Sequence, residues 1–242
     1  MRILDAALDL VFPPSLYCVC CGNIIDGTRS YSLCDHCIER MHWTLEEQTT
    51  KGGMRLLTCC EYGIYARSLI FALKYNGKRN VARNIAEIMA DRWRAGMPEN
   101  GSEEDFGEAP GYVLVPVPVH GSKRRARGFD QMDLISKHLS ENLGIPRLSC
   151  LERTRETLPM RGLGPEERRA NVEGSFRLKK HFADACGQDG GEGALSGKTV
   201  ILLDDFCTTG STAEACRDAL TPACPEEVIL FTFAARLDRG YG

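Results

Sequence analysis

The stretch TVILLDDFCTTGSTAEA, residues 199–215, predicts a strand, a loop and the start of a helix. Val200–Leu203 is an apolar run without polar alternation, which is typical of a central strand covered on both faces of a parallel sheet. A further strand is predicted at Glu227–Phe233, and it follows a predicted helix at Ala213–Leu220. This β-α-β unit indicates an α/β fold class, with a parallel sheet flanked by helices.

The loop after the first of these strands is rich in hydroxyl groups, with Thr208, Thr209, Gly210, Ser211 and Thr212. Gly210 can take a positive φ and approach a ligand closely, while hydroxyls and the free N–H groups of a helix N-terminus can hold a phosphate. The strand ends on Asp204 and Asp205, whose carboxylates can accept hydrogen bonds from sugar hydroxyls or hold a hydrated cation. The pattern therefore predicts a ribose 5-phosphate site with both aspartates as candidate catalytic residues. The alternative is that Asp205 or Ser211 only caps the helix.

A basic run follows another predicted strand, Tyr112–Val119. The run is HGSKRRARGFD, residues 120–130, and its cations are Lys123, Arg124, Arg125 and Arg127. Open α/β sheets bind ligands at the carboxyl ends of their strands, so we expect this loop to pair with a pyrophosphate group. A nucleic-acid patch is the alternative use of the same charges.

Two C-x-x-C pairs lie near the amino terminus, Cys18 with Cys21 and Cys34 with Cys37. Four thiolates spaced in this way close tetrahedrally round one ion, and zinc is the expected occupant. No ligand position is left open for water, so the ion is expected to be structural. Cys20 leaves the register of the first pair ambiguous, and reduced cysteines without metal are the other alternative. We expect an N-terminal helix and a small four-cysteine zinc-binding module at residues 1–50, and a larger α/β domain at residues 51–242.

Length, charge and cysteine content bound the class of protein. The chain has 242 residues and a net charge of −3, so any basic surface that binds an anion must be local. The amino terminus carries Asp5 and Asp9 within its apolar stretch and lacks a cleavage site of small residues, unlike a signal peptide. No apolar run approaches the length of a membrane span. The 12 cysteines are then expected to stay reduced, and we expect a cytoplasmic protein.

Two further polar segments have a predicted role. KYNGKRN, residues 74–80, places Lys74, Lys78 and Arg79 beside an Asn-Gly turn signal, and we interpret this basic patch as a solvated loop. Arg147–Arg177 is rich in arginine with little apolar periodicity, which makes it a candidate mobile lid over a phosphate ester.

These motifs resemble a known family. DDFCTTGST after an apolar strand resembles the phosphoribosyl pyrophosphate (PRPP) loop of type I phosphoribosyltransferases. Together with the paired cysteines, VPVPVHGSKRRARGFDQ, RTRETLPMRG and RRANVEGSF, it occurs in the order found in the ComF family, and the resemblance spans nearly the whole chain. That family looks like a zinc-ribbon module fused to a phosphoribosyltransferase domain. It is associated with competence and the handling of incoming single-stranded DNA.

The resemblance implies roles for the candidate residues. Asp204 and Asp205 would meet the ribose hydroxyls, residues 208–212 the 5-phosphate, and residues 123–128 the pyrophosphate with magnesium. An enzyme of this kind would displace pyrophosphate at C1 of the ribose, with an acceptor that the sequence does not identify. The alternative is a non-catalytic protein that senses PRPP or serves as a scaffold, while its basic loops and zinc module bind single-stranded DNA or a DNA-uptake partner. The family usually has Asn where this chain has Asp130.

Overall fold

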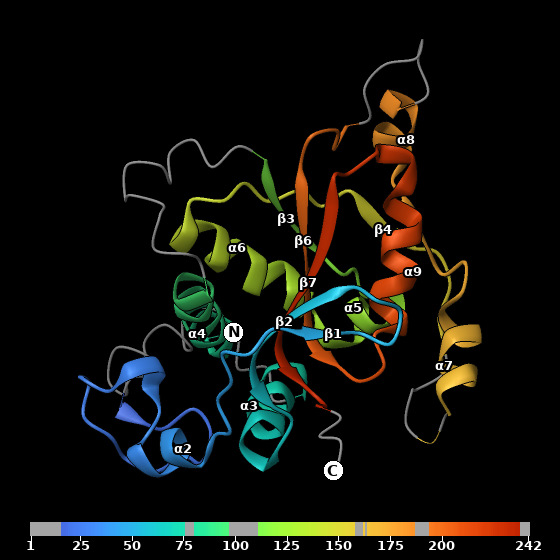
Figure 1. The fold of residues 1–242 in the computed structure, drawn as a ribbon. Coiled ribbons are helices and arrows are strands. Elements are labelled where there is room, and N and C mark those ends of the chain that lie inside the picture. The colour runs from blue at the N-terminus through green and yellow to red at the C-terminus, as the bar shows by residue number, and fades with distance from the viewer. Residues whose placement is uncertain are drawn as a thin grey trace, which may run out of the picture.

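The structure is a computed structural model that describes residues 16–75, 80–96, 111–157, 162, 164–186 and 194–237. A five-stranded sheet with the order β1-β2-β7-β6-β3 lies at its centre (Figure 1). Its strands are β1 (Gln48–Thr49), β2 (Arg55–Glu61), β3 (Tyr112–Pro116), β6 (Thr199–Cys207) and β7 (Glu227–Ala235). All neighbours are parallel except β1, which pairs antiparallel with β2. The predicted fold class is therefore confirmed, and β6 is hydrogen-bonded on both sides as expected.

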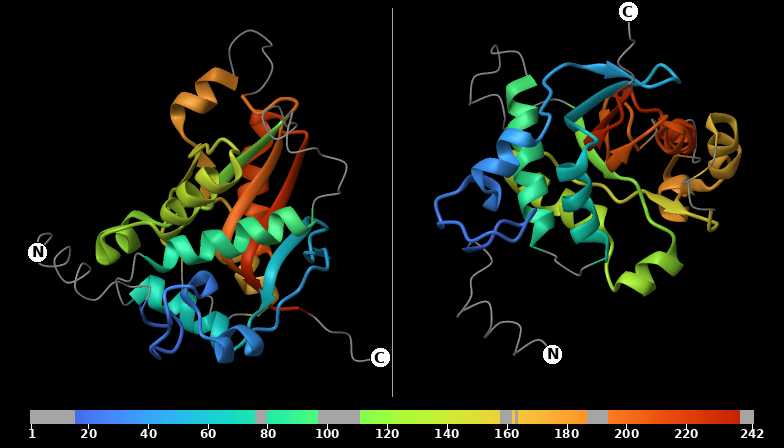
Figure 2. Two further views of the ribbon diagram at one scale, coloured as in Figure 1. Left: turned by 90° about the vertical axis from the view of Figure 1, so that its left-hand side faces the viewer. Right: turned by 90° about the horizontal axis from the view of Figure 1, so that it is seen from below.

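Helices cover both faces of this sheet (Figures 1 and 2). They are α2 (Asp35–Arg40), α3 (Ile64–Tyr75), α4 (Val81–Gly96), α5 (Gly121–Arg127), α6 (Gln131–Leu143), α7 (Pro165–Val172), α8 (Lys180–Cys186) and α9 (Ser211–Leu220). One hydrophobic cluster joins the sheet to α3, α4 and α6, and a second joins its other face to α9 and an antiparallel ribbon. The ribbon consists of β4 (Leu151–Arg153) and β5 (Phe176–Leu178). Among the described helices, none is both long enough and apolar enough to cross a bilayer.

Successive side chains of β6 alternate between the two faces of the sheet, as a strand requires. Ile201 and Leu203 belong to the cluster beneath α3, α4 and α6, whereas Val200 and Leu202 belong to the cluster beneath α9. The sequence predicts that the strand ends on Asp204 and Asp205, and β6 in fact continues to Cys207, so both aspartates are strand residues. They therefore start from opposite faces of the sheet.

The cysteine-containing segment packs against α3 and α4 (Figure 2). Tyr31 Oη donates to Asp91 Oδ2 at 2.7 Å, and Asn84 Nδ2 donates to the Tyr31 carbonyl at 2.7 Å. His36 Nε2 and Tyr65 Oη form a further hydrogen bond of 3.0 Å. This segment shares one hydrophobic cluster with the helical layer, while the domain boundary near residue 50 stays a prediction.

Two segments predicted as loops contain regular structure. The basic run at 123–128 lies mostly in α5, a helix capped by His120 Nδ1, which accepts from Ser122 N, and ended by Gly128 at a φ of 74°. Lys, Arg and Ala have high helix propensity, so a short helix forms there without an apolar face. The arginine-rich stretch at 147–177 contains β4, α7 and β5, and Glu167 Oε2 accepts from Gly164 N at 2.6 Å where α7 begins.

Candidate functional site

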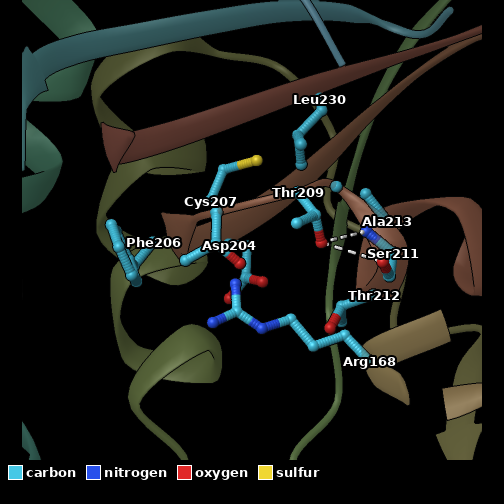
Figure 3. A pocket seen from close by; sticks show the side chains of 11 residues that line it. Arg168, Asp204, Phe206, Cys207, Thr209, Ser211, Thr212, Ala213 and Leu230 are labelled. Carbon is cyan, nitrogen blue, oxygen red and sulfur yellow. Dashed lines mark hydrogen bonds between the residues drawn. The ribbon is translucent and has the colours of Figure 1, made fainter. Parts of the chain in front are cut away.

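A cavity of about 130 Å³ lies at the carboxyl end of β6, where the strand turns into α9 (Figure 3). All the predicted loop residues line it, namely Thr208, Thr209, Gly210, Ser211 and Thr212. Asp204 of β6 and Arg168 of α7 also line it. Whole ligand sites commonly measure roughly 300–1,000 Å³, so this cavity has the size of a subsite for one group such as a phosphate.

The loop has the backbone geometry that an anion cradle needs. Gly210 has a φ of 85° and occupies the N-cap position of α9 without a side-chain cap. The alternative that Asp205 or Ser211 caps this helix is therefore wrong. The first N–H groups of a helix lack intrahelical partners and are available to an anion. Thr209 Oγ1 and Ser211 Oγ lie 2.8 Å apart beside them, so hydroxyls line the same cavity.

Gly210 is also required by close packing. A Cβ at this position would lie 2.8 Å from the Cβ of Thr50, which sits in the turn between β1 and β2. The turn thus lies against the phosphate-sized cavity, and only glycine combines the left-handed backbone with this contact.

Asp204 faces the cavity and the guanidinium group of Arg168 (Figure 3). Burial raises the pKa of Asp204 to about 7, and the neighbouring charge of Asp205 adds to the effect. Its Oδ1 accepts a hydrogen bond from Asp205 N at 2.9 Å. Near neutral pH this carboxyl group therefore exchanges a proton easily and can accept or donate a hydrogen bond to a sugar hydroxyl.

Asp205 points to the other side of the sheet and pairs with Lys74 of α3. Lys74 Nζ lies 2.9 Å from Oδ1 and 2.7 Å from Oδ2, and only 5% of the Asp205 side chain is exposed. Burial alone would lower the pKa of the Lys74 ammonium, but the charge of Asp205 and its hydrogen bond outweigh burial and raise the pKa. For Lys74 the interpretation as part of a solvated patch is wrong, because the side chain is only 22% exposed. The other two residues of that patch, Lys78 and Arg79, lie outside the described residues.

The structure turns two of the four predicted α5 cations inward. Lys123 and Arg127 are half-buried, whereas Arg124 and Arg125 are exposed. Burial lowers the pKa of Lys123, and the nearby charges of Arg153 and Arg127 lower it further. Arg127 Nη1 also donates to Gln131 Oε1 at 2.8 Å, which fixes the guanidinium at the start of α6.

Two arginines that the sequence did not single out complete the cationic side of the site. Arg153 ends β4, with its guanidinium 5.0 Å from the centre of the Phe176 ring, and Arg168 lies on α7. The Nε atoms of both are buried and have no hydrogen-bond partner among the described residues. Burial lowers the pKa of Arg153, which also lies within the field of Asp204. The arginine content of residues 147–177 was a signal for such a role, but not for which side chains turn inward.

Asp130 has a structural role at the start of α6. Its Oδ1 accepts from Met132 N at 2.9 Å and from Asp133 N at 3.2 Å, which caps the helix. Asn is also a good N-cap residue, so the exchange with Asn at this position preserves the cap.

The predicted cysteine cluster is confirmed as a geometric unit. The sulfur atoms of Cys18, Cys21, Cys34 and Cys37 all lie within 4.8 Å of one another. Cys21 Sγ and Cys34 Sγ are 3.6 Å apart, close to the ~3.8 Å that Zn–S bonds of about 2.3 Å produce in a tetrahedron.

The register of the first pair is resolved as well. Burial would raise the pKa of Cys18, but N–H donors of Cys21, Cys34 and Cys20 outweigh it and lower the pKa to about 7, which favours a thiolate. Cys20 lies outside the cluster, with its sulfur 3.7 Å from the Tyr65 carbonyl oxygen, and burial raises its pKa to about 11. The cluster is compatible with a structural zinc ion.

Comparison with known proteins gives three curated relatives, although no protein-family model matches the chain. Competence protein F of Haemophilus influenzae is 32% identical over 126 residues, which are 50% of this chain and 49% of that protein. DNA utilization protein YhgH is 27% identical in Salmonella typhi over 65% of this chain and 62% of that protein. In Salmonella typhimurium it is 25% identical over 81% of this chain and 79% of that protein. The chain thus spans about half the length of the first relative and less than two-thirds of the second.

Among solved structures, phosphoribosylpyrophosphate synthetase from Mycobacterium smegmatis is 14% identical. The match covers 80% of this chain and 73% of that chain, with a TM-score of 0.28. A likeness of this size carries no argument about the site.

Proposed function

We propose that this chain, a homologue of the ComF-family proteins Competence protein F and DNA utilization protein YhgH, binds PRPP at the carboxyl end of β6. The observation that carries the proposal is the buried Nε donor of Arg168, a residue that lines the cavity, because this donor has no hydrogen-bond partner among the described residues. A buried polar donor without a partner costs about 1–3 kcal/mol and a charged one costs more, so an anionic ligand in the cavity would recover that energy.

The three parts of PRPP would meet different segments. The 5-phosphate would lie in the cavity formed by residues 208–212, and the ribose hydroxyls beside Asp204. The pyrophosphate would lie toward the inward cations Lys123 and Arg127. Magnesium prefers phosphate oxygens and water over an all-protein site, so it would enter with the pyrophosphate and neutralise part of its charge.

The same arrangement suits transfer of the ribose phosphate. A nucleophile would displace pyrophosphate at C1, and Lys123, Arg127 and Arg153 would stabilise the charge that develops on the leaving group. Release of pyrophosphate from PRPP in the presence of a panel of bases and amines tests this step. A protein that binds PRPP and releases no pyrophosphate with any acceptor would be a sensor rather than a transferase.

The binding experiment compares the two sides of α5. Calorimetry with PRPP and Mg²⁺ should show at least tenfold weaker affinity for the double variant Lys123→Ala with Arg127→Ala, because each lost charge-assisted contact is worth about 1.5–3 kcal/mol. Affinity for ribose 5-phosphate should change far less, since it lacks the pyrophosphate. The matched control is Arg124→Ala with Arg125→Ala, which removes equal charge from the exposed side. Equal PRPP affinity in the wild type and in Lys123→Ala with Arg127→Ala would refute the placement of the pyrophosphate beside these two residues.

A second function, binding of single-stranded DNA, is favoured by the exposure of Arg124 and Arg125 and by the name of the YhgH relatives. In this case the double variant Arg124→Ala with Arg125→Ala should bind single strands of any sequence more weakly than the wild type. It should also reduce the salt dependence, by about 0.7 in slope for each lost phosphate contact. Unchanged DNA affinity in Arg124→Ala with Arg125→Ala would refute the proposal that these two residues of α5 bind DNA.

A further inference from the structure

The Lys74–Asp205 pair joins α3 to the end of β6 across 131 residues of sequence. The ammonium donates a hydrogen bond to Oδ1 at 2.9 Å and forms an ion pair with Oδ2 at 2.7 Å, although Oδ2 has no hydrogen-bond partner among the described residues. It therefore lies close to both oxygens, where a bidentate metal ion would lie. Both side chains are largely withdrawn from water, with 22% of Lys74 and 5% of Asp205 exposed. Salt screens an ion pair this buried only weakly. Burial also keeps the Lys74 ammonium close to Asp205, whereas a surface lysine can move away from its partner.

The surroundings of the pair also disfavour a second cation. The charges that act on Lys74 are those of Asp205, Asp204 and Arg127. Arg153 acts on Asp204 from the opposite face of the sheet. A divalent ion that approached Asp205 would therefore meet the ammonium directly and the guanidinium group of Arg127 nearby. It would have to displace Lys74 and leave that ammonium buried without this counter-ion.

We infer that Lys74 is the resident counter-ion of the acidic pair: it holds Asp205, keeps divalent cations away from this carboxylate and leaves Asp204 as the ligand-facing member. The part that concerns the sugar rests on the proposed function, whereas the exclusion of metal does not. Magnesium would then be needed only for the pyrophosphate, and ribose 5-phosphate would bind equally well with or without it.

The first test measures metal binding without any sugar. Mn²⁺ is titrated into the zinc-loaded protein, and the free ion is followed by electron paramagnetic resonance. The wild type and Asp205→Asn should bind Mn²⁺ equally weakly. Lys74→Gln should gain a Mn²⁺ site that binds at least tenfold more tightly. The double variant Lys74→Gln with Asp205→Asn should lose this additional site. Lys180→Gln removes an exposed lysine of α8 and should behave as the wild type. Lys74→Arg keeps the positive charge and should bind no additional Mn²⁺.

Two outcomes would overturn the inference. The first is that the wild type binds Mn²⁺ at a site that disappears in Asp205→Asn. This comparison needs no Lys74 variant, so it can be made even if Lys74→Gln does not fold. The other is a folded Lys74→Gln protein, judged by circular dichroism, that gains no Mn²⁺ affinity, because the pair would then only fasten α3 to the sheet.

A second measurement separates this inference from the proposed function. Calorimetry of ribose 5-phosphate with the wild type should give the same dissociation constant in Mg²⁺ and in EDTA-treated buffer that retains the protein's tightly bound zinc. A tenfold or larger dependence on Mg²⁺ would contradict the inference. Absence of any binding of ribose 5-phosphate and PRPP would instead refute the proposed function and leave the Mn²⁺ result to stand.

Discussion

Replacing Asp204 with Asn should stabilise the unliganded protein, and the gain should grow as the pH rises from about 4 to about 8. Burial and the charge of Asp205 raise the pKa of Asp204 from an ordinary 3.8 to about 7. Between these values the unfolded chain has released the proton while the folded protein retains it. The folded state therefore loses stability as the pH rises through this window, and the loss is complete above the folded pKa. Asn cannot ionise and avoids this loss.

The size of the stability gain in Asp204→Asn follows from the shift in the pKa of Asp204. A change from 3.8 to about 7 is roughly three units, and at 1.36 kcal/mol per unit it corresponds to a gain of up to about 4 kcal/mol above pH 7. Below pH 4 the gain should vanish. Asn keeps the Oδ1 atom that accepts from Asp205 N at 2.9 Å, so the backbone at the end of β6 has no reason to move. Small proteins have total stabilities of about 5–15 kcal/mol, so a change of this size is easily measured.

Urea unfolding at several pH values between 4 and 8 measures the free energy of unfolding of both proteins. The comparison is made at each pH, so that the pH dependence shared by the two proteins, including that of the cysteine cluster, cancels. Asp184→Asn makes the same chemical change at an exposed position on α8 and should follow the wild type. The reasoning would be refuted by parallel curves for Asp204→Asn and wild type, or by a variant that loses stability relative to wild type as the pH rises.

Two further changes test the metal cluster and the loop. Replacing Cys34 and Cys37 with Ser should remove about one zinc per chain and lower the melting temperature, because metal binding is coupled to folding; unchanged metal content by elemental analysis would contradict the assignment. Gly210→Ala should cost more than the about 1–2 kcal/mol of a left-handed backbone alone, because the new Cβ would lie 2.8 Å from Thr50 Cβ. Gly144→Ala, at a φ of 69° with nothing within 4 Å, measures the backbone cost by itself, so equal losses at the two positions would argue against the close contact.

The sequence predicts well those features that depend on neighbours along the chain. The apolar run of β6, its hydroxyl-rich loop and the spacing of the four cysteines are local patterns, and each appears in the structure where the pattern places it. The sequence analysis places both aspartates at the end of β6 and assigns both to the ribose. Adjacent residues of a strand face opposite sides, so the strand pattern itself indicates that the two carboxylates are separated.

Other features depend on contacts that no local pattern encodes. Lys74 reaches Asp205 across 131 residues, and its own surroundings in the sequence are those of an ordinary basic turn. The orientation of α5 leaves Lys123 and Arg127 half-buried and Arg124 and Arg125 exposed. A run of cations without apolar residues gives no periodicity from which to infer that orientation. Arg168 is placed by α7, a short polar helix whose position is set by tertiary packing against α9.

The division of the acidic pair between two faces explains how one strand end could select a ligand that carries two phosphate-containing groups. Asp205 is neutralised by Lys74 from α3, so its charge does not repel an anion in the cavity on the other face. Asp204, with its raised pKa, adds little negative charge below pH 7. On the cavity side, Asp204 therefore adds little opposing charge to the cations Arg168, Arg153 and Lys123. A ribose 5-phosphate alone would occupy the loop, whereas the pyrophosphate of PRPP would bring additional negative charge to the cations beside it. Preference for PRPP over ribose 5-phosphate should for this reason fall when the inward cations of α5 are removed, while the loop retains its affinity for the 5-phosphate.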